Sequence, residues 1–168
     1  MSDLLQRFPW PDAGAHILDL ACGTGHRGLR ALEKGYRVTF LDRDPGRLLP
    51  QVAQHPHAIV RAQDLETGNS ELGEQQYDAV WVFNYLHRPL MPLIAKAIKP
   101  GGILVYETFT TRQATIGNPD NPAFLLNKNE LQQTFANWQQ LHYFEGYLPG
   151  LNQGQFKAQL IARKPDSD

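Results

Sequence analysis

The chain has 168 residues, of which 42% are hydrophobic and 20% charged, and its formal net charge is −1. This length suits one hydrophobic core, and we expect a single domain over residues 1–168. Near-neutral charge without a run of Lys or Arg disfavours a nucleic-acid partner but does not exclude one. The lone cysteine, Cys22, excludes an internal disulfide. Without a signal-like or membrane-spanning apolar run, we expect a cytoplasmic protein with no membrane partner.

Short β-branched or aromatic runs alternate with helical patterns, which is typical of a parallel α/β sheet. Strands are predicted at 16–20, 36–42, 58–62, 77–83 and 103–109, then near 140–145 and 155–163. Helices are predicted at 27–34, after Asp44-Pro45 with a break at Pro50, at 89–98 and at 129–136. Residues 99–102 should form a tight turn. The loop at 111–127 is too long for a mere connection, which indicates a functional role.

The first predicted strand ends in a glycine-rich turn that opens a helix. Such a turn brings the backbone close to a ligand at the carboxyl edge of the sheet. The segment from Gly23 to Gly28 fits the dinucleotide fingerprint G-x-G-x-x-G, with Asp42 as its ribose-binding acid. The overlapping segment from Asp19 to Gly25, Asp-Leu-Ala-Cys-Gly-Thr-Gly, resembles D/E-x-G-x-G-x-G, the first motif of class I methyltransferases, with Ala21 replacing its first glycine.

Three acidic residues favour the second of these interpretations. A carboxylate at Asp19 suits the cationic, amino-bearing end of S-adenosylmethionine, whereas it would repel a pyrophosphate. Asp42 ends the second strand, where it can accept both ribose hydroxyls. Asp64 follows the third strand and can accept from an adenine amino group, while the amide of Leu65 meets a ring nitrogen. Asp42 and Asp64 could each also merely form a turn.

The fourth strand is followed by side chains that suit a methyl acceptor. Asn84 and Tyr85 come directly after it, and Tyr85 could instead simply pack. His87 is the side chain best suited to titrate near neutral pH, or it is a packing residue before Pro89. Arg112, in the long loop, could bind an anionic substrate or lie on the surface.

The second half of the chain narrows the resemblance. Lys99-Pro100-Gly101-Gly102, the run from Asn121 to Asn127 and Phe135-Ala136-Asn137-Trp138 resemble the tellurite-resistance methyltransferases and their small-molecule relatives. The resemblance implies a doubly wound, mostly parallel, seven-stranded Rossmann-like sheet with helices on both faces and an antiparallel last strand. It also implies a soft nucleophile as acceptor, such as a chalcogen oxyanion or a thiol. Few residues precede the first strand, and 146–156 lacks the family's His and Arg, which puts tellurite itself in doubt.

The expected enzyme is therefore an S-adenosylmethionine-dependent methyltransferase with a small-molecule acceptor and no metal. The cofactor is expected to contact Asp19, Ala21, Cys22, Gly23, Gly25, Asp42, Arg43, Asp64, Leu65 and Asn84. The acceptor is expected to face Asn84, Tyr85, His87 and Arg112. The open alternatives are a nucleic-acid methyltransferase, a nicotinamide-dependent oxidoreductase, and a non-catalytic binding protein or small subunit. A homodimer or a partner subunit that covers the cofactor also stays open.

Overall fold

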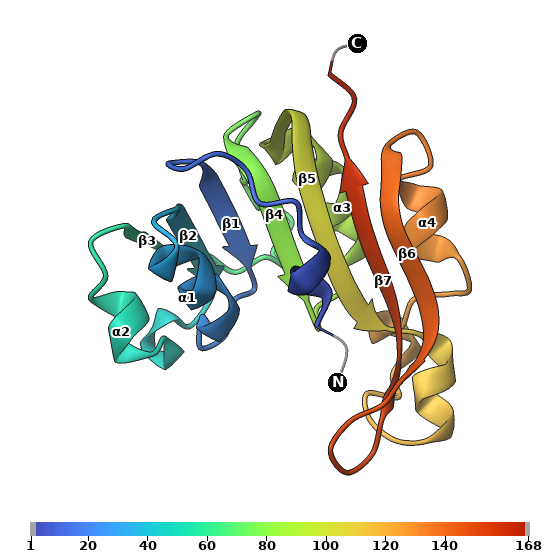
Figure 1. Cartoon of the computed structure of the whole chain (residues 1–168). Coiled ribbons are helices and arrows are strands. Elements are labelled where there is room, and N and C mark those ends of the chain that lie inside the picture. Colours follow the sequence, from blue (N-terminus) through green and yellow to red (C-terminus); the bar gives the residue numbers. More distant parts are fainter. Residues whose placement is uncertain (1–2, 167–168) are drawn as a thin grey trace.

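The computed structural model describes residues 3–166, which form a seven-stranded sheet in the order β3-β2-β1-β4-β5-β7-β6 (Figure 1). The strands are β1 (His16–Leu20), β2 (Arg37–Asp42), β3 (Ala58–Ala62), β4 (Tyr77–Phe83), β5 (Ile98–Phe109), β6 (Gln139–Leu148) and β7 (Gln155–Arg163). The first five strands run parallel, and β7 is antiparallel to both β5 and β6. The predicted seven-stranded, mostly parallel sheet is confirmed.

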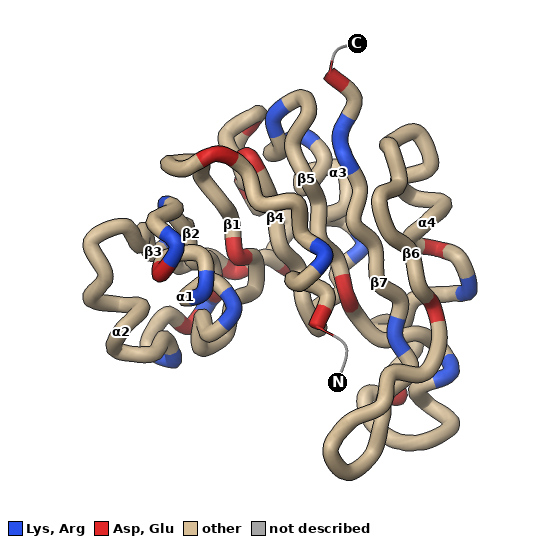
Figure 2. Tube along the Cα trace, in the orientation of Figure 1, with Lys and Arg blue, Asp and Glu red and all other residues tan. Residues whose placement is uncertain are grey.

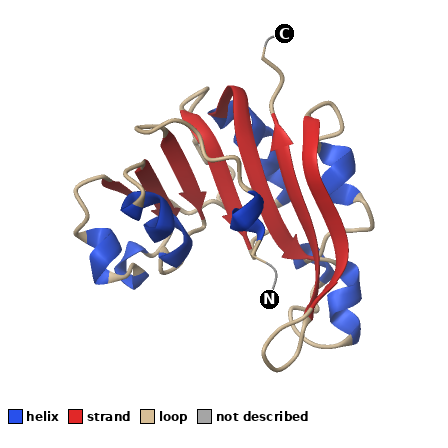
Figure 3. Ribbon diagram, in the orientation of Figure 1, coloured by secondary structure: helices blue, strands red, loops and turns tan. Residues whose placement is uncertain are grey.

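Helices cover both faces of the sheet (Figure 3). The α-helices are α1 (His26–Glu33), α2 (Pro50–Ala53), α3 (Met91–Ala97) and α4 (Glu130–Thr134). Short 3-10 helices are η1 (Leu4–Arg7), η2 (Pro45–Arg47), η3 (Arg88–Leu90), η4 (Thr111–Thr115) and η5 (Pro122–Phe124). The side chains of η1, α1 and α2 pack in one hydrophobic core, and those of α3 and α4 pack in the other.

The central strands are covered on both faces, as their nearly continuous apolar sequences predict. In β4, Trp81 lies in the core beneath α1, whereas its neighbours Val80 and Val82 lie in the core beneath α3. All three side chains are fully buried. Alternate residues of one strand therefore fill two cores, which fixes the register of the sheet.

Several predicted boundaries were wrong, each for a local reason. The helix predicted to end at Ile98 stops one residue earlier, because Ile98 is already extended and pairs with Tyr77. Residues 99–102 do not form a separate turn. They belong to β5 and cause a register shift against β4, with Gly101 at a φ of 78°. The helix predicted from Asn129 begins at Glu130, because Asn129 is left-handed.

Two further elements differ from their predicted extents. The helix expected after Asp44 is a short 3-10 turn, and Pro50 begins the separate helix α2 at its first position, where a proline costs no hydrogen bond. The strand predicted near 140–145 runs from Gln139 to Leu148, because it pairs with β7 along its length.

The sheet order places one crevice at the carboxyl ends of the strands. The chain passes outward from β1 to β2 and β3, and then crosses to β4 on the other side of β1. Open α/β sheets bind ligands where the strand order reverses in this way. The ends of β1 and β4, with β2 and β3 beside them, therefore define the place to look for a site.

Candidate active site

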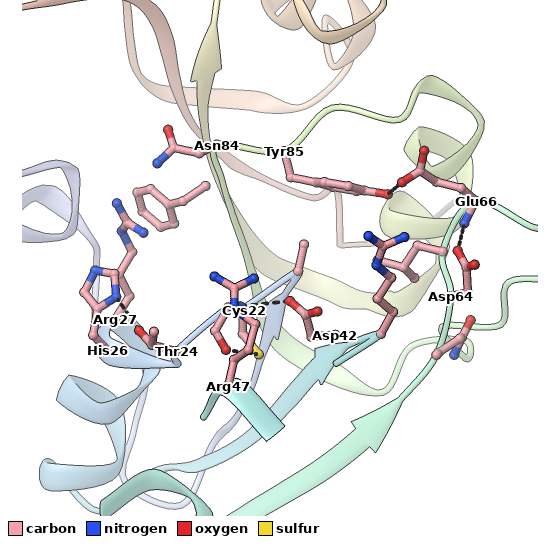
Figure 4. Close-up of a pocket in the computed structure, with 16 residues that line it drawn as sticks. Cys22, Thr24, His26, Arg27, Asp42, Arg47, Asp64, Glu66, Asn84 and Tyr85 are labelled. Carbon is pink, nitrogen blue, oxygen red and sulfur yellow. Dashed lines mark hydrogen bonds between the residues drawn. The ribbon is translucent and has the colours of Figure 1, made fainter. Parts of the chain in front are cut away.

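A cavity of about 460 Å³ lies against the turn between β1 and α1, and we call it the turn cavity (Figure 4). Ala21, Cys22 and Gly23 line it from the turn. Ala21 and Gly23 both have a positive φ, 54° and 57°. A Cβ atom added to Gly23 would meet no atom within 4 Å, so the backbone here faces open space. The backbone of the turn is thus open to the cavity, and its contact with a ligand stays a prediction.

Asp42 at the end of β2 holds the turn in place. Its Oδ2 accepts the backbone N–H of Gly23 at 2.9 Å, and its Oδ1 accepts the N–H of Asp44 at 3.1 Å. Asp42 and the adjacent Arg43 both line the turn cavity. A carboxylate offers about four lone-pair sites, so Asp42 keeps acceptor capacity for a ligand beside these two bonds.

The segment after β3 forms the opposite wall of the turn cavity. Asp64 and Leu65 line it, together with Glu66. The Oδ1 of Asp64 accepts the N–H of Glu66 at 3.0 Å, which is the turn-forming bond expected of an aspartate in a loop. Asp64 therefore forms a turn and also lies at the cavity.

The end of β4 supplies the remaining wall. Asn84 and Tyr85 line the turn cavity, and Asn84 has a left-handed φ of 56°. The backbone N–H of Asn84 donates to the carbonyl of Glu107 on β5 at 2.8 Å. The Tyr85 hydroxyl donates to Glu66 at 3.4 Å across the cavity mouth (Figure 4). The left-handed backbone of Asn84 is strained for a non-glycine residue, and such strain is frequent at functional sites.

Asp19 lies beneath the turn and does not line the cavity. Its side chain is 4% exposed, and its Oδ2 accepts the N–H of Gly28 in the first turns of α1 at 3.2 Å. Burial raises the pKa of Asp19 to about 7, against the opposing effects of the Gly28 N–H and Arg27. In this geometry Asp19 braces α1 against β1, and its predicted contact with a cofactor stays a prediction.

Three other predicted residues also lie outside the turn cavity. Gly25 is buried and does not line the cavity. A Cβ atom added to Gly25 would lie 3.0 Å from Leu48 and 3.1 Å from Phe40, so the backbone there is closely packed. The Nδ1 of His87 lies 4.0 Å from Oε1 of Glu66, so His87 reaches the cavity only through that carboxylate. Arg112 is exposed in η4, with its guanidinium 4.3 Å from the centre of the Phe156 ring.

Cys22 lines the cavity but is a poor nucleophile. Burial raises the pKa of its thiol to about 12, and the nearby carboxylates of Asp19 and Asp42 act in the same direction. The reactive form of cysteine is the thiolate, so the thiol stays protonated and inert at neutral pH.

Comparison with known proteins identifies the family. The family model described as "Methyltransferase domain" matches residues 18–104, which run from the middle of β1 through the glycine turn and β4 into β5. The chain belongs to this methyltransferase family. This membership confirms the predicted class, the S-adenosylmethionine-dependent methyltransferases, over the nicotinamide-dependent oxidoreductases.

Curated proteins that match this chain carry different names and are matched over only part of their length. Methyltransferase-like protein 27 from Homo sapiens is 30% identical over 150 residues, which are 85% of this chain and 56% of that protein. Hemagglutinin 1 from Eikenella corrodens is 29% identical over 144 residues, 79% of this chain and 47% of that protein. This methyltransferase chain thus spans about half the length of the curated relatives it matches.

A solved structure supports the fold. The crystal structure of TehB from Haemophilus influenzae superposes with a TM-score of 0.75 and 21% identity, covering 90% of this chain and 58% of that chain. At this identity the likeness concerns the fold. The superposition therefore supports the resemblance to the tellurite-resistance methyltransferases as a likeness of fold alone.

The turn cavity suits the methyl donor of this methyltransferase class. Its volume lies within the range of about 300–1,000 Å³ that is usual for small-molecule sites. Carboxylates after β2 and β3 are acceptors for hydroxyl and amino groups, and the open side of Gly23 leaves room for a ligand against the backbone. The chemistry of these donors and acceptors fits a nucleoside that carries an amino acid.

Sequence reasoning missed several residues that line this methyltransferase's turn cavity. They are Thr24, His26, Arg27, Arg47, Gln63, Glu66 and Phe83. His26 and Arg27 directly follow the glycine turn at the start of α1. Their position after a ligand-binding type of turn could have predicted that they line the cavity. Arg47 comes from η2, and only the folding of that segment against the turn brings it near.

Positive and negative charges are mixed along the chain. Figure 2 shows Lys and Arg interspersed with Asp and Glu, without a continuous basic stripe. Within residues 3–166, no group of three or more His, Cys, Asp or Glu side chains could hold a metal ion. In the same part of the chain, no helix is long and apolar enough to cross a membrane.

Proposed function

We propose that this chain transfers a methyl group from S-adenosylmethionine to a small molecule with a soft nucleophile, such as a chalcogen oxyanion or a thiol. The observation that carries the proposal is the turn cavity, where Asp42 lies beside the exposed backbone of Gly23 and Asp64 lines the opposite wall. Residues 1–168 acting as a single catalytic domain are part of this proposal.

In the proposed complex, each wall of the turn cavity holds one part of the donor. Asp42 accepts from the ribose hydroxyls while keeping its bond to Gly23. Asp64 and Leu65 hold the adenine. The turn of Ala21, Cys22 and Gly23 lies along the amino-acid part, with Arg43 at the ribose end.

When bound, S-adenosylmethionine supplies a methyl group on a positively charged sulfur, which leaves as a neutral thioether after in-line displacement. The protein's task is to align the acceptor with the methyl group and to exclude water, and such positioning can contribute about 7–11 kcal/mol. In this proposal Asn84 and Tyr85, which line the turn cavity at the end of β4, orient the acceptor.

The need for a base depends on the acceptor. An oxyanion or thiolate already carries the attacking electron pair, so no base is required. An acceptor that carries a proton would have to release it, and in this proposal His87, whose Nδ1 lies 4.0 Å from Oε1 of Glu66, passes it to water. Arg112 would act only if the loop containing η4 moved toward the site, because its guanidinium now rests on Phe156.

The proposal is tested with donor labelled in its methyl group. Purified protein is incubated with selenite, tellurite, a set of small thiols, and transfer RNA, and the label is followed into product. Turnover of a small acceptor that is lost in Asn84→Ala is the expected result. Transfer RNA as the sole active acceptor would instead establish the nucleic-acid alternative, which the interspersed charges disfavour.

A further inference from the structure

A second cavity of about 640 Å³ opens beside the turn cavity, and we call it the hairpin cavity because the connection between β6 and β7 forms one wall. Its other walls come from η1, the first turns of α1 and β5. His26, Arg27, Phe83 and Asn84 line both cavities. The two cavities therefore share a wall at the end of β4. In the proposed function, the methyl group of the donor faces this shared wall.

Arg27 is the charged residue of this shared wall. Its guanidinium lies 4.2 Å from the centre of the Phe83 ring, and the residue is half-buried. Burial lowers the pKa of Arg27, but an arginine stays charged at neutral pH. Within residues 3–166, no carboxylate lies within ion-pair distance of this guanidinium and no side chain or carbonyl accepts a hydrogen bond from it.

The other charged groups of the hairpin cavity have partners. Arg30 pairs with Asp3 at 2.7 Å. The ammonium of Lys157 lies 3.5 Å from Glu107. Two carboxylates thus pair with two of the three cations that line the cavity. Among residues 3–166, Arg27 forms no ion pair, and the nearby carboxylates of Glu107, Asp19 and Asp3 favour its charged form without contacting it.

The Glu107–Lys157 pair in the wall of the cavity is buried and hydrogen-bonded. Glu107 and Lys157 are 7% and 6% exposed, and the amide of Gln159 donates to the second oxygen of Glu107 at 2.7 Å. Both oxygens of Glu107 are therefore occupied. A polar wall of this kind accommodates a polar ligand, whereas an empty apolar cavity would select an apolar one.

We propose that the hairpin cavity holds the methyl acceptor and that Arg27 binds a carboxylate group of that acceptor. This inference rests on the proposed function and narrows its acceptor to an organic anion, which keeps a thiol that carries a carboxylate and leaves out an inorganic chalcogen oxyanion. The cavity is far larger than an inorganic oxyanion of a few atoms, since a water molecule occupies only about 30 Å³. A planar guanidinium matches a carboxylate with two parallel hydrogen bonds.

The methyl transfer requires no reactant besides the donor and the acceptor. The acceptor's nucleophilic atom, placed near Asn84, forms a bond to the methyl carbon. The bond between that carbon and sulfur breaks, and its electron pair stays on sulfur. If the acceptor atom carries a proton, water takes it. Arg27 forms no covalent bond and acts by holding the carboxylate end.

The test uses calorimetric titration of the full chain saturated with S-adenosylhomocysteine. The probes are succinate and citrate, with succinamide as the neutral match for succinate. We expect at least one carboxylate to bind wild type, and succinamide not to bind. Arg27→Gln should weaken that binding about tenfold, or about 1.4 kcal/mol. Arg27→Lys should lose less, and Arg37→Gln, which removes the same charge from the exposed start of β2, should lose nothing.

Other outcomes would overturn the inference. One is that neither carboxylate binds wild type, and another is that Arg27→Gln binds as tightly as wild type. A tenfold loss of S-adenosylhomocysteine affinity in Arg27→Gln would assign Arg27 to the donor instead. If wild type fails to bind S-adenosylhomocysteine at all, the proposed function fails and the inference with it. Matching circular dichroism spectra and melting curves show that the variants are folded.

Discussion

The carboxylate of Asp42 accepts the backbone N–H of Gly23 at 2.9 Å, so the end of β2 holds the turn that follows β1. The same carboxylate lines the turn cavity. One side chain therefore shapes the backbone of the site and also faces its ligand. Removing it should affect both the stability of the turn and the affinity for the donor.

Asp42→Ala is expected to weaken S-adenosylhomocysteine binding at least tenfold, or about 1.4 kcal/mol, in a calorimetric titration. It should also destabilise the fold by about 1 kcal/mol, because the N–H of Gly23 loses its acceptor. Asp44→Ala is the matched control, since it removes the same charge from an exposed residue that only caps η2. Equal affinities of the two variants would count against the role of Asp42.

Ala21→Gly is expected to stabilise the protein. Ala21 has a φ of 54°, and the left-handed region costs a non-glycine residue about 1–2 kcal/mol. Glycine avoids this cost but loses about 0.5–1 kcal/mol of backbone entropy, so we expect a net gain of about 0.5 kcal/mol. Urea unfolding measures the difference. Ala53→Gly in α2 should do the opposite, and a destabilised Ala21→Gly would refute this assignment of strain.

Gly28→Ala is expected to destabilise the protein by about 1–3 kcal/mol through overpacking. An added Cβ would lie 2.4 Å from the Phe40 ring and 2.9 Å from the Asp19 carboxylate, so α1 would have to move away from the sheet. Gly117→Ala is the control, because its Cβ would meet no atom within 4 Å. Thermal and urea unfolding should separate the two variants, and equal stabilities would contradict the packing seen here.

Asp19 makes stability depend on pH. Its pKa is raised from 3.8 to about 7 by burial, so the folded state binds this proton more tightly than the unfolded state does. The stabilisation is therefore complete at low pH and is lost as pH rises toward 7. Between about pH 5 and pH 7 wild type should lose about 2 kcal/mol from this group.

Asp19→Asn keeps an oxygen for the N–H of Gly28 and removes the titration. We expect this variant to be more stable than wild type at about pH 8, and its unfolding free energy to change less with pH. Urea unfolding across that pH range measures both. Parallel pH profiles would show that Asp19 does not titrate as described. An unchanged stability with a large loss of S-adenosylhomocysteine affinity would place Asp19 in contact with the donor.

Strand positions were largely predictable from local sequence. The bounds of β1, β3, β4 and β7 coincide with the predicted ranges, because apolar or β-branched runs there end at turn-forming residues. The neighbouring positions of the glycine turn, Asp42 and Asp64 were also predictable from the sequence. They follow consecutive strands, and the carboxyl ends of parallel strands meet at one edge.

The rest depended on contacts between distant segments. The bracing of α1 by Asp19 depends on the position of Gly28 against that carboxylate, which the local sequence does not reveal. The hairpin cavity exists because β7 returns beside β5 and brings Lys157 to Glu107, 50 residues away in the chain. That Arg27 forms no ion pair among the residues that the structure describes becomes visible only when Lys157 and Glu107 are placed.

The central claim is that the turn cavity binds S-adenosylmethionine, and calorimetric titration of wild type with S-adenosylhomocysteine and with NAD tests it most directly. We predict one site for S-adenosylhomocysteine, with a matching rise in melting temperature, because a ligand of the native state stabilises it. NAD should produce neither effect. Binding and stabilisation by NAD without any by S-adenosylhomocysteine would contradict the account.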